Sequence, residues 1–98
     1  MSESETQRQF FEVLLKHYPR LAEFWNREKR EFDEVMASPA VLSGGVLSSG
    51  EKTILKALAS IWLGSANSTF QLDITDLAAL PVSERRPLVA WIANPFWP

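Results

Sequence analysis

Apolar residues recur at helical spacing most clearly over residues 48–64. At this spacing the apolar side chains share one face of a helix and the polar side chains share the opposite face. Ser48 and Glu51 stand three apart, as in a capping box, where each side chain accepts the backbone N–H of the other residue. The pattern therefore predicts a central helix that the rest of the chain covers. Its apolar face would be Ile54, Leu55, Leu58, Ile61 and Trp62, and its polar face Lys52, Lys56 and Ser60.

Two further apolar stripes, separated by Pro19, predict a pair of helices over residues 1–37. Ser2 or Ser4 can cap the first helix, which should end near Tyr18 because a residue before proline disfavours the helical conformation. Its wide apolar face should contact two neighbours, or one neighbour and a partner chain. The second helix is expected from Pro19 to the end of this range, with the proline in its first turn. The first stripe is Phe10, Phe11, Leu14, Leu15 and Tyr18, extended by Val13, and the second is Leu21, Phe24, Trp25, Phe32, Val35 and Met36.

The remaining segments predict a connection and several shorter elements. Residues 38–47 read as the connection, because Pro39 ends the preceding helix and two glycines follow. Alternation near residues 70–72 is typical of a short extended piece. A short helix over 73–81 and a last helix capped by Ser83 should follow. The residues expected to face inward on the last helix are Leu88, Trp91 and Ile92.

These elements predict an all-α fold, a small single-domain bundle of four or five helices, with one short extended segment near Phe70 to Leu72. The domain would span residues 1–98, with the N-terminal helical pair at 1–37 and the central and C-terminal helices at 48–98. The chain is long enough for one core, and 46% hydrophobic residues, including four Trp and six Phe, supply the material for it.

The composition excludes several function classes. A net charge of -2 disfavours strong nonspecific binding of nucleic acid, which needs an excess of positive charge. The absence of cysteine excludes disulfides and thiolate chemistry, and no apolar run is long enough to span a bilayer. We therefore expect a cytoplasmic protein with no membrane association.

The sequence contains no recognisable catalytic or cofactor-binding set. His17 is the only histidine, and an imidazole near a helix end is explained by the helix dipole. Asp73 and Asp76 stand three apart at a helix start, where capping and the dipole explain both carboxylates. Neither a glycine-rich phosphate loop nor a set of metal ligands is evident. The expectation is a non-enzymatic protein with no cofactor and no metal.

Aromatic residues carry the main functional hypothesis, binding of a protein partner or self-association through an apolar helical surface. The candidate partner-binding residues are Trp25, Glu28, Phe96 and Trp97. Glu28 falls inside the apolar stripe of the expected second helix, where it would be either a buried acid that anchors a partner or a residue that reaches solvent. Phe96 and Trp97 would either fold onto the core of their own chain, which we favour, or fill a pocket on a partner.

The alternative hypothesis is DNA binding. The segment LDITDLAALPVSERRPLVAWIA resembles the helix-turn-helix of bacterial DNA-binding proteins, with its recognition helix at residues 84–92. Pro81 stands where that family usually has a glycine. The resemblance implies a small DNA-binding or transcription-accessory protein that uses a degenerate helix-turn-helix at residues 73–93. The residues that would contact phosphates are Lys52, Lys56, Arg85 and Arg86.

Overall fold

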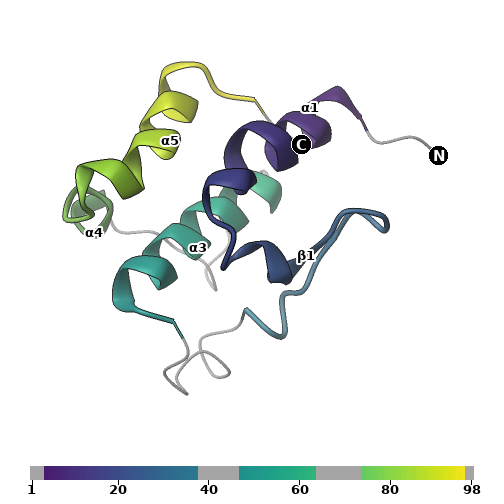
Figure 1. The fold of residues 1–98 in the computed structure, drawn as a ribbon, viewed down its shortest axis with the longest axis horizontal. Coiled ribbons are helices and arrows are strands. Elements are labelled where there is room, and N and C mark those ends of the chain that lie inside the picture. The colour runs from purple at the N-terminus through teal and green to yellow at the C-terminus, as the bar shows by residue number, and fades with distance from the viewer. Residues whose placement is uncertain (1–3, 38–46, 64–73, 97–98) are drawn as a thin grey trace.

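The structure is a computed structural model that describes residues 4–37, 47–63 and 74–96. These residues form a mostly helical fold with one small antiparallel β-hairpin (Figure 1). The fold is therefore mostly helical, as predicted, although the small two-stranded sheet means that it is not purely all-α. The expected extended segment at 70–72 and most of the connection at 38–47 lie outside the described residues. The α-helices are α1 (Glu5–Gln9), α3 (Ser49–Leu63), α4 (Ile74–Ala78) and α5 (Val82–Ala93), and the strands are β1 (Trp25–Asn26) and β2 (Glu31–Phe32).

The first helix begins as predicted at a serine cap. The Ser4 hydroxyl accepts the Gln7 N–H at 3.2 Å, and the Gln7 side chain accepts the Ser4 N–H at 3.3 Å. After α1 the helical path continues as a π-helical turn over Phe10–Leu14 and a 3-10 turn over Leu15–His17. All five residues of the predicted stripe are buried, whereas Val13, expected to extend it, is 54% exposed.

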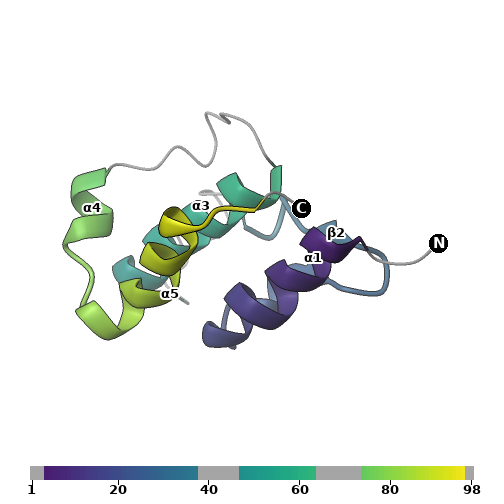
Figure 2. The ribbon, with the colours of Figure 1, turned by 90° about the horizontal axis from the view of Figure 1, so that it is seen from above.

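Helix α3 is the central element, as the periodicity predicted. Its capping box is complete, because Ser48 N–H donates to Glu51 Oε1 at 2.9 Å and Glu51 N–H donates to Ser48 Oγ at 3.1 Å. Arg20 forms an ion pair with the other Glu51 oxygen at 3.3 Å. The N-terminal helix and α5 both lie beside α3, and the hairpin and α4 lie toward opposite ends of the molecule (Figures 1 and 2). The buried residues of α3 are Ile54, Leu55, Ala57, Leu58, Ala59 and Ile61.

The predicted second helix of the N-terminal pair is wrong, because a β-hairpin occupies its place. A short 3-10 turn, Ala22–Phe24, leads into β1, which pairs with β2 so that Trp25 faces Phe32 and Asn26 faces Glu31. Residues seven apart share a face of a helix, and they also face each other across a hairpin with a suitable loop. The same apolar spacing therefore fitted both structures.

Short polar side chains decide between the two structures in favour of the hairpin. Asn26 Oδ1 accepts the Lys29 N–H at 3.0 Å, and Asp33 Oδ1 accepts the Met36 N–H at 2.9 Å. Such local bonds offer the backbone a turn in place of a continuing helix. Arg30 closes the loop with a positive φ of 54°, which no helical residue has.

An aromatic cluster holds the hairpin against the helices. Trp25 stacks on Phe32 with ring centroids 4.5 Å apart, and its other neighbours are Phe10 at 5.3 Å and Trp62 at 6.5 Å. Phe10 also lies 5.0 Å from Trp62. One cluster thus joins three segments, which meets the expectation that the first helix contacts two neighbours.

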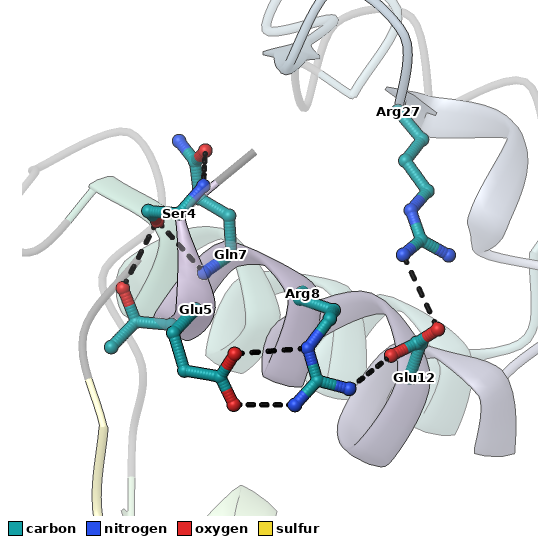
Figure 3. Close-up of polar contacts among 7 residues, drawn as sticks. Ser4, Glu5, Gln7, Arg8, Glu12 and Arg27 are labelled. Atoms are coloured by element: carbon teal, nitrogen blue, oxygen red, sulfur yellow. Dashed lines mark hydrogen bonds and ion pairs between the residues drawn. The ribbon is translucent and has the colours of Figure 1, made fainter. Parts of the chain in front are cut away.

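Charged side chains cover the outer edge of this junction (Figure 3). Arg8 binds the Glu5 carboxylate and donates to Glu12 Oε2 at 2.7 Å. The other Glu12 oxygen pairs with Arg27 at 3.4 Å, and the Arg27 guanidinium lies 5.3 Å from the centre of the Phe11 ring. The hairpin loop is therefore tied to the first helix by both an ion pair and a cation–π contact.

We expect Leu58→Ala to lower the free energy of unfolding by about 2–5 kcal/mol, the usual loss for a buried leucine. Leu58 is fully buried in the middle of α3. Chemical denaturation followed by tryptophan fluorescence measures the loss. Val35→Ala is the control, because Val35 is 75% exposed and should change stability by less than about 0.5 kcal/mol. A similarly small effect at Leu58 would contradict its place in the core.

Glycine substitutions at residues 29 and 30 distinguish a hairpin loop from a helix in this segment. Glycine suits the positive φ of Arg30 but not the ordinary conformation of Lys29. Arg30→Gly should therefore be about 1 kcal/mol more stable than Lys29→Gly in urea denaturation. If this segment were helical, both glycines would destabilise it about equally.

Candidate functional site

Two hydrogen bonds position α5 against the rest of the chain. The Tyr18 hydroxyl donates to the Glu84 carbonyl at 2.6 Å and joins the end of the first helix to α5. Arg85 Nη1 donates to the Ala78 carbonyl at 2.6 Å and joins α5 to α4. A third, local bond, from the Trp91 indole N–H to the Phe96 carbonyl at 2.9 Å, joins the end of α5 to the residues that follow it.

The start of α5 differs from its prediction. The helix begins at Val82 with Pro81 in the cap position, and no side chain caps it. Ser83, expected to be the cap, lies inside the first turn. Proline in the extended conformation before the helix supplies the boundary, since Pro81 has φ -54° and ψ 147°.

An apolar pocket of about 250 Å³ opens between α3, α4 and α5. Leu88 is buried at its base and Trp91 is partly buried. Ile92 was expected to face inward, but it lies at the pocket edge and is 57% exposed. The pocket is large enough for one large apolar side chain or a small apolar molecule. Its lining consists of Ala57, Ser60, Ile61, Leu77, Leu88, Trp91 and Ile92.

The outward face of α5 continues this apolar surface. Val82 and Val89 are 54% and 52% exposed, and they stand seven residues apart on the same side of the helix as Ile92. Arg85 and Arg86 are the charged residues beside them in the helical register. We call this set, together with the pocket, the α5 surface: an exposed aliphatic stripe that leads into an apolar pocket.

A second pocket, also of about 250 Å³, lies on the other side of α5 against the first helix. Val13 and Leu14 line it from the first helix, and Pro87 and Phe96 line it from the C-terminal part. Trp91 borders both pockets. One partly buried indole therefore separates two apolar hollows, so a change in its rotamer would alter both.

The four candidate partner-binding residues do not form one site. Trp25 is buried in the aromatic cluster with 7% exposure, and Glu28 lies exposed in the hairpin loop. The hypothesis of a buried Glu28 is therefore wrong, because the segment is a hairpin whose loop points the carboxylate to solvent. Phe96 is partly buried against the core, as we favoured. Trp97 lies outside the described residues.

Trp25 carries the one buried side-chain polar atom that lacks a hydrogen-bond partner within the described part of the chain. Its indole N–H is enclosed by the aromatic cluster. A buried donor without an acceptor costs about 1–3 kcal/mol, which the packing of the large ring offsets. The position of Trp25 is thus set by ring contacts and not by its polar atom.

The residues named for DNA binding are divided between two helices. Lys52 and Lys56 are partly exposed on α3, Arg86 is exposed on α5, and Arg85 is bound to the Ala78 carbonyl. Helix α4, which would be the first helix of a helix-turn-helix, has five residues. None of these four basic residues lines the apolar pocket.

Metal chemistry finds no support in the part of the chain that the structure describes. No group of three or more His, Asp or Glu side chains is placed there to hold an ion. His17 lies exposed at the end of the first helix, and Asp76 is exposed on α4.

Among residues 4–37, 47–63 and 74–96, no helix has the length and apolarity needed to cross a membrane.

Sequence reasoning missed the residues that make the α5 surface. Ile92 was assigned to the core, and Val82, Val89 and Leu77 were not singled out. The spacing of seven between Val82 and Val89 was a usable signal. Those two valines define an aliphatic stripe that Leu88 and Trp91 do not share, which predicts a second, outward apolar face.

Comparison with known proteins identifies no relative. No protein-family model matches the chain, and neither a curated protein nor a solved structure matches it.

The hydroxyl that positions α5 gives the site a pH dependence. Burial raises the pKa of Tyr18 to about 12; the nearby Leu88 amide opposes this rise and the Glu84 carboxylate adds to it. The folded state therefore favours the protonated phenol, whereas an unfolded tyrosine ionises near about pH 10. The stabilisation is complete below pH 10 and is lost as the pH rises toward about 12, because the unfolded chain then binds fewer protons.

We expect the tyrosinate absorbance of the native protein to titrate well above about pH 10. Tyr18 is the only tyrosine, so the titration reports this one group. Urea denaturation should show a steeper loss of stability between pH 10 and 12 in the wild type than in Tyr18→Phe. All other titrating groups are the same in the two proteins, so the difference reports Tyr18 alone. If the tyrosinate of the native protein titrated with the pKa of an unfolded tyrosine, near about 10, the buried hydrogen bond would be contradicted.

Proposed function

We propose that this chain is a non-enzymatic protein-interaction module that binds its partner, another protein or a second copy, through the α5 surface. The observation that carries the proposal is the apolar pocket between α3, α4 and α5 with Ile92 exposed at its edge. An apolar side chain that is exposed beside an apolar hollow gains free energy when a partner covers both.

The distribution of exposed aliphatic residues supports the same face. Among the described residues, six large apolar residues stand out as exposed, and four of them, Ile74, Val82, Val89 and Ile92, belong to α4 and α5. Single exposed apolar residues are common on protein surfaces, but several on neighbouring elements, one of them lining a pocket, are typical of a binding site. Trp91 supplies the large partly buried aromatic that is frequent among residues with a high contribution to binding.

DNA binding by α4 and α5 remains the alternative. Arg86 and Lys56 could contact phosphates, but Arg85 donates to the Ala78 carbonyl and the outward face of α5 carries three aliphatic side chains. Phosphate contacts favour a polar and positively charged surface. The geometry therefore supports protein binding better.

The test is affinity capture from a nuclease-treated lysate of the source organism, combined with sedimentation of the purified protein. We expect wild type to retain a protein partner or to self-associate, and Ile92→Asp to lose this by at least about tenfold, since a charge must then be buried without a partner. Ile92 is 57% exposed, so the variant should fold.

Val35→Asp is the matched control, because Val35 is an exposed aliphatic residue on the hairpin side of the molecule. It should bind like wild type, and all three proteins should unfold at similar temperatures. Retention of the same partner by Ile92→Asp, or loss of retention only after nuclease treatment, would contradict the proposal.

A further inference from the structure

The charges around the α5 surface are unevenly distributed. Lys56 stands one turn before Ser60 on α3, on the flank of the helix that borders the pocket, and Ser60 Oγ donates to its carbonyl at 2.9 Å. On α5, Arg85 stands one turn before Leu88 and Arg86 lies beside Val82 and Val89 in the register. Lys56 and Arg86 thus flank an apolar surface as cations, whereas Arg85 donates to the Ala78 carbonyl.

Among the described residues, few carboxylates lie on the same side. Glu84 is the acidic residue within α5, and its Oε2 atom lies near Gly50 at the start of α3, 3.6 Å from where a side-chain Cβ would stand. Glu84 is therefore turned toward α3 and away from the outward face. Asp76 on α4 is the nearby exposed carboxylate, so the surface keeps an excess of positive charge although the chain carries a net charge of -2.

From this arrangement we infer that the α5 surface binds an acidic amphipathic helix, with one large apolar side chain in the pocket and carboxylates opposite Lys56 and Arg86. The inference rests on the proposed function and names the chemistry of the partner. The pocket of about 250 Å³ accepts one anchor side chain, and the aliphatic stripe of α5 matches the apolar face of a helix laid along it.

Charge complementarity is what selects this partner. An apolar groove alone would accept any amphipathic segment, whereas a basic border attracts acidic segments and repels basic ones. A flat anionic surface, such as duplex DNA or a lipid headgroup layer, would satisfy the cations and leave the pocket empty. A helix with carboxylates beside an apolar anchor satisfies both.

The probe is a display library of single-helix scaffolds with randomised surface positions, selected against the wild-type protein. We expect the selected helices to carry one Leu, Phe or Trp flanked by Asp or Glu. Their affinity should fall by about tenfold for Lys56→Glu combined with Arg86→Glu, because attraction becomes repulsion, and should fall with rising salt. Glu-to-Lys exchange in the peptide should restore binding to this double variant.

Several outcomes would overturn the inference: selected helices that lack acidic residues, binding that is insensitive to the double charge reversal, or tighter binding to duplex DNA or to vesicles containing phosphatidylserine. Lys29→Glu with Arg30→Glu is the control for net charge, since both residues lie in the hairpin loop far along the chain from α5. If neutral helices bind wild type and fail on Ile92→Asp, the proposed function stands and the inference on charge fails. If the library yields no binder that depends on Ile92, the proposed function and the inference on charge both fail.

Discussion

The contact of Phe10 with Trp25 and Trp62 is the interaction on which the rest of this structure depends. These rings come from the first helix, the hairpin and α3, and their centroids lie 5.0 to 5.3 Å from that of Phe10. Two paired residues per strand could not hold a hairpin in water. The hairpin persists because Trp25 and Phe32 add their area to a core that the helices already form, even though the Trp25 N–H finds no acceptor among the described residues.

The opposite end of the molecule is built on a different principle. Helix α5 buries only Leu88 fully and is located by single hydrogen bonds from Tyr18 and Arg85. An element held in this way leaves much of its apolar surface uncovered. The junction around Phe10 buries a cluster of aromatic rings, whereas the outward face of α5 leaves Val82, Val89 and Ile92 exposed.

The sequence predicted the elements whose signals are local. Ser48 was identified as a cap from Glu51 three residues on, Ser4 was one of two serines named as the cap of the first helix, and the apolar face of α3 follows from its periodicity. The segment from Trp25 to Phe32 could not be assigned in this way, because residues seven apart serve a helix and a hairpin equally. Asn26 and Asp33 carried the deciding information, but their turn-forming bonds compete with helix formation by an amount that only the docking of Trp25 settles. The α5 surface was missed for a related reason: whether Ile92 is inside or outside depends on how α5 is rotated, which the long-range Tyr18 bond helps to fix.

The bond between Tyr18 and Glu84 spans 66 positions of the chain, and this separation affects how the protein is made. During synthesis from the N-terminus, Phe10, Phe11 and Tyr18 leave the ribosome long before α3 and α5 exist to cover them. Until α3 and α5 have been made, the aromatic face of the first helix is therefore exposed to water wherever the hairpin does not cover it. The interval ends for Phe10 when Trp62 of α3 has been made, and for Tyr18 only when Glu84 of α5 has been made.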